Sequence, residues 1–155
     1  CTSHGHCALG DVQMLLAGDL LNQIVSAGFA ARNLCIPFYG LYGACSTMSE
    51  SLSVGSMLCD GGFADRLICA TCSHFCTAER QYRMPLELGN QRTPTAQWTV
   101  TGSGAVMVSS GPAAKQAKAV ITHTTCGKVI DLGKASAVFL RFLQPVVINQ
   151  LIHNG

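Results

Sequence analysis

A regular alternation of short apolar runs with segments of helical periodicity constrains the fold most strongly. Residues 12–17 ("VQMLLA") and 35–44 are short apolar runs typical of buried strands. Residues 20–33, between them, place apolar side chains on one face at helical spacing, which predicts a helix. We expect a second helix over residues 46–58 and a third buried strand over residues 65–73. This order predicts an α/β fold with a largely parallel sheet and covering helices.

A single cysteine, Cys45, stands where the second predicted strand meets the second predicted helix. Thr47 and Glu50 have capping-box spacing, which marks a helix start just after it. Backbone N–H groups and the helix dipole favour an anion at such a junction. Cys45 is therefore a candidate nucleophile or part of an anion pocket, and the alternative is a small residue that fills a tight turn.

Other polar residues follow the strands that neighbour this junction. His74 closes the third strand, at the sheet edge where open α/β folds place ligands, and could pair with Cys45 as a base. Asp19 and Asn22 follow the first strand and could line the same edge. Helix capping is the rival role for Asp19, and a loop hydrogen bond is the rival role for His74.

Residues 75–96 lose periodicity and are predicted to form a long polar loop. Two further strands are expected over residues 98–110 and 119–125. Guanidinium groups bind carboxylates in bidentate fashion and tryptophan offers a flat face, so the polar set around the loop suits a small planar anion. The members of this set are Arg80, Arg83, Arg92, Gln97 and Trp98.

Composition narrows the function classes. The chain of 155 residues fits one domain, and its net charge of +2 argues against nucleic acid as a partner. It is 48% hydrophobic and only 12% charged, which indicates that part of its surface is buried against something else. No apolar run reaches the length of a membrane span, and residues 1–10 lack the apolar region of a signal peptide.

Nine cysteines are an odd number and do not suggest a disulfide framework. Most of them, such as Cys35, Cys59 and Cys69, are predicted to be small buried hydrophobic residues in a reducing compartment. The stretch "CATCSHFC" invites a zinc site, but no second ligand pair has the required spacing, so we predict no metal site.

Four stretches carry a specific resemblance: "AGDLLNQIVSAGFAARNLCIPFYGLYGACSTMSESL", "GGFADRLICATCSHFCTAERQYR", "GNQRTPTAQWTVTGSGAVMV" and "ITHTTCGKVIDLG". They are similar to the central region of the stage V sporulation protein AD family of spore-forming Firmicutes. The resemblance runs from about residue 12 to residue 133.

The resemblance implies a thiolase-like fold, in which two halves of βαβαβαββ topology pack around central helices. Residues 11–133 are expected to form the N-terminal-half domain. Residues 1–10 and 134–155 do not match the pattern, and a frameshift or truncation would explain these ends. In thiolases the nucleophilic cysteine starts a helix in the first half, and Cys45 in "GACST" matches that position.

The resemblance also implies a function: non-enzymatic binding of dipicolinic acid and its uptake into the developing spore. Its implied partners are dipicolinic acid, with calcium as a candidate companion, and other proteins of the same operon at the spore inner membrane. Cys45 is carried over as a pocket residue, with Asp19 and His74 beside it, and no cofactor is expected. A homodimer is left open.

Two other interpretations compete with this one. The first is an acyl transferase of the thiolase or ketoacyl-synthase type that uses Cys45. The missing second half supplies the catalytic histidine in thiolases, so these residues cannot build a complete condensing site. The second is an inactive, truncated fragment, for which a broad unfolding transition would be expected.

Overall fold

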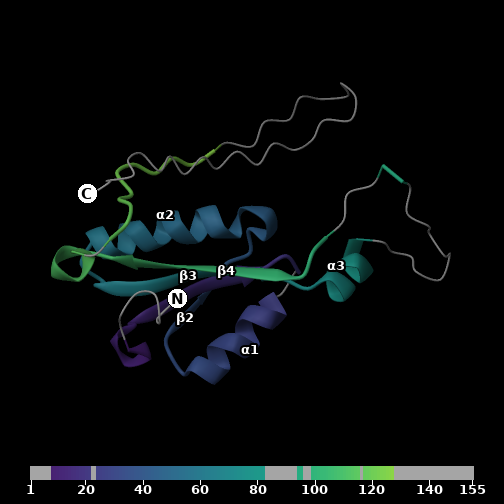
Figure 1. The fold of residues 1–155 in the computed structure, drawn as a ribbon, viewed down its shortest axis with the longest axis horizontal. Coiled ribbons are helices and arrows are strands. Elements are labelled where there is room, and N and C mark those ends of the chain that lie inside the picture. The colour runs from purple at the N-terminus through teal and green to yellow at the C-terminus, as the bar shows by residue number, and fades with distance from the viewer. Residues whose placement is uncertain (1–7, 22–23, 83–93, 96–98, 116, 128–155) are drawn as a thin grey trace.

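The computed structural model describes residues 8–21, 24–82, 94–95, 99–115 and 117–127 (Figure 1). Four strands and three α-helices alternate along these residues, with short 3-10 turns between some of them. In chain order the elements are η1 (Leu9–Asp11), β1 (Met14–Asp19), α1 (Val25–Leu34), β2 (Phe38–Gly40), η3 (Ala44–Ser46), α2 (Thr47–Asp60), β3 (Arg66–Ser73), α3 (Phe75–Tyr82), β4 (Gly102–Ser109) and η5 (Gly111–Ala114).

The strands form one mixed sheet in the order β2-β1-β3-β4. β1 pairs in parallel with β2 and with β3, whereas β4 runs antiparallel to β3. Each parallel pair is joined through a helix, as the crossover geometry of parallel strands requires. The predicted α/β class, a mostly parallel mixed sheet with covering helices, is confirmed.

Helices α1 and α2 pack on opposite faces of the sheet, so that β1 and β3 are buried on both sides (Figure 1). On the α1 face, Leu15 and Ile68 from paired positions of β1 and β3 pack with Ala27. On the α2 face, Leu16 and Leu67 are fully buried. Continuous apolar runs in these two strands follow from this two-sided burial.

A close approach between α2 and β3 explains the glycine in the middle of α2. A Cβ atom added at Gly55 would lie 2.9 Å from both the Cys69 sulfur and a Leu67 methyl group. The helical cost of glycine, about 1 kcal/mol relative to alanine, is offset here by dense packing against the sheet.

Two predicted elements form with different bounds. The helix expected over residues 20–33 starts only at Val25, because the Asp19 carboxylate accepts hydrogen bonds from the amides of Ser26 and Ala27 in its first turn. The strand expected over residues 35–44 shortens to the three residues of β2.

Three sequence predictions are wrong. Thr47 does not cap α2, because η3 runs directly into the helix and the Thr47 N–H already bonds to the Ala44 carbonyl. Residues 119–125 contain no strand, only a single bridge residue at Ala119, because β-branched composition alone does not make a strand. The expected loop over residues 75–96 begins with helix α3.

The exposure of the cysteines also differs from expectation. Cys59 and Cys69 are buried as predicted, but Cys35 is exposed. It ends α1 with a φ of 54°, in the left-handed region. None of the described helices has the length and apolar character needed to cross a membrane.

Candidate functional site

The carboxyl ends of the three parallel strands bring three of the predicted site residues to one edge of the sheet, which we call the carboxyl edge. Asp19 ends β1, His74 directly follows β3, and Cys45 lies in the segment that leaves β2. Asp19 pairs with Cys72 across the β1–β3 ladder, and the Leu20 N–H donates to the Cys72 carbonyl at 3.1 Å. Ligands of open α/β sheets bind at this kind of edge.

Cys45 is exposed in the middle of η3, at the start of the continuous helical segment that leads into α2. The turn is tied by the Ser46 N–H and hydroxyl, which both donate to the Gly43 carbonyl at 2.9 Å. Ala44 has a φ of 47°, a conformation that costs a non-glycine residue roughly 1 kcal/mol or more. The chain therefore holds Cys45 outward in a constrained turn at a helix N-terminus.

Gly18 lets β1 approach this turn. A Cβ atom added there would fall well within 3.0 Å of the Leu41 carbonyl oxygen and lie 2.9 Å from the Thr47 methyl group. The Leu41 N–H in turn donates to the Ala17 carbonyl at 2.9 Å. The end of β1 is thus packed directly against the start of α2, two residues after Cys45.

Asp19 is only 2% exposed and performs the capping role that competed with a ligand role. Its Oδ2 atom accepts hydrogen bonds from the N–H groups of Ser26 at 2.6 Å and Ala27 at 3.2 Å. Its Oδ1 atom is buried and has no hydrogen-bond partner in the part of the chain that the structure describes. One carboxylate oxygen therefore caps the first turn of α1.

His74 caps the opposite side of the edge with its backbone. Its carbonyl accepts hydrogen bonds from the Thr77 hydroxyl and the Ala78 N–H, both at 3.0 Å, and so starts α3. The residue is exposed. The pairing of His74 with Cys45 stays a prediction.

Sequence reasoning missed the residues that hold α3 beside the sheet. The Thr101 hydroxyl accepts a hydrogen bond from the Phe75 N–H at 2.9 Å, and Glu79 accepts from both the N–H and the hydroxyl of Thr99. The capping preference of threonine is a general signal, but its partner lies 26 residues away in the chain. Only the fold reveals such a pairing.

Burial keeps the inner thiols protonated. It raises the pKa of Cys69 to about 12, and this thiol donates to the Ser51 carbonyl at 3.0 Å. Burial, and then the negative charge of Asp19, raises the pKa of Cys72. These two thiols are poor nucleophiles, so Cys45 is the better candidate for chemistry at the carboxyl edge.

Five predicted site residues lie outside the described residues: Asn22, Arg83, Arg92, Gln97 and Trp98. Arg80 is described and is exposed in the last turn of α3. In the described ranges, no three His, Cys, Asp or Glu side chains are grouped so that they could hold a metal ion.

The fold defines the class of this protein. The structure resembles 3-oxoacyl-[acyl-carrier-protein] synthase III from Aquifex aeolicus VF5 with a TM-score of 0.59, over 80% of this chain and 38% of that one. The sequences are 16% identical, so this comparison establishes the fold alone. The chain has the thiolase-like fold expected from the sequence.

The family follows from the sequence comparisons. The model of the family "Stage V sporulation protein AD" matches residues 1–141, and the chain belongs to this family of sporulation proteins. Over 123 residues it is 56% identical to stage V sporulation protein AD of Bacillus subtilis (strain 168). That match covers 79% of this chain and 35% of the relative, so the chain spans about a third of the relative's length.

Proposed function

We propose that this chain carries part of a binding site for dipicolinic acid at the carboxyl edge, and that the protein takes up this ligand into the developing spore without catalysing a reaction. The observation that carries the proposal is the exposed Cys45 turn at the start of α2. The N-terminus of a 14-residue helix attracts carboxylates through its backbone N–H groups and its dipole.

Charge at the site indicates how the ligand would bind. Dipicolinate carries two carboxylates, and the buried Asp19 would repel it. A calcium ion that travels with the ligand offsets this repulsion, because calcium prefers carboxylate and carbonyl oxygens. The Oδ1 atom of Asp19, which is buried and has no hydrogen-bond partner among the described residues, is the oxygen that we assign to such an ion. Arg83, Arg92, Gln97 and Trp98 remain the candidates for contacts to the carboxylates and the ring.

Calorimetric titration of the chain with dipicolinate, with and without calcium, tests this proposal. We expect saturable binding that strengthens with calcium and weakens in Cys45→Ala. The matched control is Cys126→Ala, which removes another exposed thiol outside the site. Benzene-1,3-dicarboxylate keeps both carboxylates but lacks the ring nitrogen, so it should bind calcium less well and bind the chain more weakly.

Two outcomes of this titration and a thermal melt would count against the proposal. A cooperative thermal melt without dipicolinate binding would show that these residues fold but do not suffice for the site. A broad, non-cooperative melt would favour the inactive-fragment interpretation.

Acyl transfer is the second candidate function, and the exposed Cys45 thiol in a thiolase-like fold is the observation that favours it. An acyl-CoA would then transfer its acyl group to the Cys45 sulfur and release free CoA. Mass spectrometry of the chain after incubation with acetyl-CoA separates the two functions. An adduct on Cys45 that is absent in Cys45→Ala would support transfer, and an unmodified chain would contradict it.

We also propose that the protein acts at the periphery of the spore inner membrane, together with other proteins of the same operon. The apolar composition of the chain supports an extensive contact surface. Fractionation of sporulating cells would test this location: release from membranes by high salt supports peripheral attachment, and recovery only in the soluble fraction contradicts it.

A further inference from the structure

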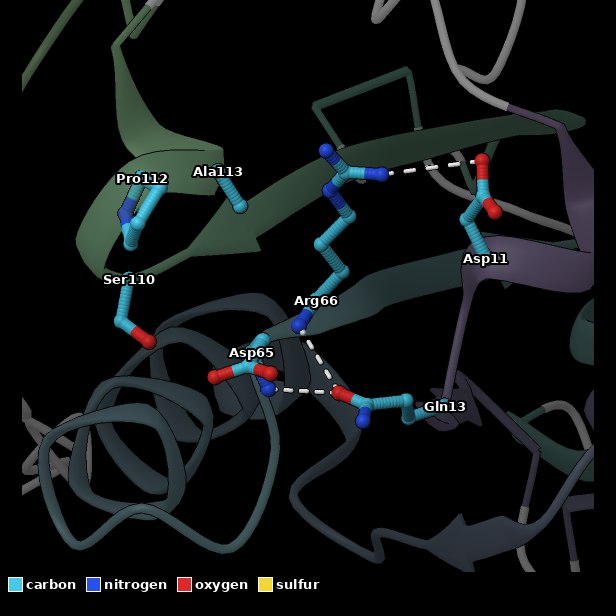
Figure 2. Close-up of a pocket in the computed structure, with 7 residues that line it drawn as sticks. All are labelled: Asp11, Gln13, Asp65, Arg66, Ser110, Pro112 and Ala113. Carbon is cyan, nitrogen blue, oxygen red and sulfur yellow. Dashed lines mark hydrogen bonds and ion pairs between the residues drawn. The ribbon is translucent and has the colours of Figure 1, made fainter.

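A pocket lies at the edge of the sheet opposite the carboxyl edge, where β1 and β3 begin (Figure 2). It has a volume of about 400 Å³ and is lined by residues from the starts of β1 and β3 and from the chain that follows β4. We call it the amino-edge pocket. The lining residues that matter here are Asp11, Gln13, Asp65, Arg66, Ser110 and Pro112.

Hydrogen bonds between neighbouring strands fix the floor of the amino-edge pocket. The Gln13 side-chain oxygen accepts hydrogen bonds from the N–H groups of Asp65 at 2.5 Å and Arg66 at 3.1 Å. The Gln13 N–H donates to the Arg66 carbonyl, and the Ser110 N–H donates to the Asp65 carbonyl, each at 3.0 Å. Because the backbone sets these positions, the pocket exists before any ligand arrives, which lowers the cost of binding.

Acidic and basic side chains both line this pocket, and their charges are not fully neutralised by one another. The Asp65 carboxylate has no hydrogen bond or ion pair among the described residues. An Arg66 nitrogen lies 3.6 Å from an Asp11 oxygen, an ion pair longer than a hydrogen bond. The Arg66 side chain is 34% exposed, so it can still accept a second anionic partner.

Figure 2 shows the guanidinium group of Arg66 and the carboxylate of Asp65 on opposite sides of the pocket. With two carboxylates and one guanidinium, the pocket has an excess of negative charge and disfavours a dicarboxylate such as dipicolinate. A ligand that matches it carries a cation toward Asp65 and a single anion toward Arg66. The ring of Pro112 adds an apolar wall for a short carbon chain.

We propose that the amino-edge pocket binds a small zwitterion of the amino-acid type, with its ammonium group on Asp65 and its carboxylate on Arg66. The side-chain Nε2 group of Gln13 and the Ser110 hydroxyl supply further hydrogen bonds to the carboxylate. This site is separate from the carboxyl edge and does not depend on the function proposed there.

Titration followed by amide chemical shifts tests the proposal, with a series of unbranched amino acids in which the two charges are spaced increasingly far apart: glycine, 4-aminobutyrate and 6-aminohexanoate. We expect saturable shifts at Gln13, Arg66 and Ser110, with one spacing preferred. Butylamine and butyrate carry only one of the charges each and should bind at least tenfold more weakly. Equal binding of a single-charge probe, or no binding of any member up to tens of millimolar, would overturn the proposal.

Matched variants identify the charges involved. Asp65→Asn and Arg66→Gln should each weaken binding about tenfold, whereas Asp60→Asn and Arg32→Gln, which remove the same charges elsewhere, should not change it. Asp11→Asn frees the guanidinium of Arg66 and should strengthen binding, which a mere loss of folding could not do. Equal effects of Asp65→Asn and Asp60→Asn would contradict the assignment, and thermal melts of all variants establish that each is folded.

Discussion

Replacement of Gly18 by alanine should be among the most damaging small changes in this chain. The added Cβ atom would overlap the Leu41 carbonyl oxygen and press on the Thr47 methyl group, which lies 2.9 Å away. The Leu41 carbonyl is part of the backbone, so it can move only if the hydrogen bond between the Leu41 N–H and the Ala17 carbonyl is disturbed. The overlap therefore forces β1 and the Cys45 turn apart.

The expected loss in the free energy of unfolding has two contributions. Overpacking of a dense site costs typically 1–3 kcal/mol, and loss of a backbone hydrogen bond adds about 1 kcal/mol. We expect Gly18→Ala to lower the free energy of unfolding by roughly 3 kcal/mol and the melting temperature by about 10 °C for a chain of this size. Urea denaturation followed by circular dichroism measures both the free energy and its cooperativity.

Gly28 provides the matched control, since it receives the same change in the middle of α1. A Cβ atom added at Gly28 meets nothing within 4 Å, and alanine favours a helix by about 1 kcal/mol over glycine. Gly28→Ala should therefore stabilise the chain. A Gly18→Ala variant as stable as the parent, or a Gly28→Ala variant that loses more stability than Gly18→Ala, would refute the reasoning.

Three further predictions concern the same region and its core. Asp19→Ala should lower stability by about 1–2 kcal/mol in urea melts because α1 loses its cap, and Asp19→Asn, which keeps an accepting oxygen, should lose less. Ala44→Gly should raise the unfolding free energy by about 1 kcal/mol by relieving the positive φ, and an unchanged value would show that the turn is not strained. Burial raises the pKa of Cys69 to about 12, so the folded chain keeps a proton that the unfolded chain loses near pH ~8.5. The contribution of Cys69 to the free energy of unfolding is therefore complete below pH ~8.5 and is lost as the pH rises toward 12. Melts at alkaline pH should show this decline, and Cys69→Ala should reduce its slope.

Sequence patterns predicted the fold where burial dominates. β1 and β3 lie between two helices, so their apolar runs carry a strong signal, and the prediction of a largely parallel sheet followed from it. The patterns failed where a contact distant in sequence decides the local structure. α3 begins where the Thr101 hydroxyl, far along the chain, accepts from the Phe75 N–H.

In the candidate site, too, some features were predictable from local sequence patterns and others depend on contacts distant in the chain. The carboxyl edge was predictable, because parallel strands align their ends, and Asp19, Cys45 and His74 do lie along it. The turn that exposes Cys45 was not, because a capping box at Thr47 and Glu50 was expected where η3 instead runs into α2. The amino-edge pocket had no local signal, since its floor joins Gln13 to Arg66, which lie 53 residues apart in the chain.

The pairing of β1 with β3 has a consequence for how the chain folds. β1 comes before both of its ladder partners, β2 and β3, in the described chain, yet it lies between them in the sheet. Closing the contact between Gln13 and Arg66 across 53 residues costs entropy before burial compensates for it. The edge of β1 that faces β3 therefore stays unpaired until β3 has been synthesised, even once β2 has paired with the other edge, and a chaperone that shields this edge would prevent aggregation during that period.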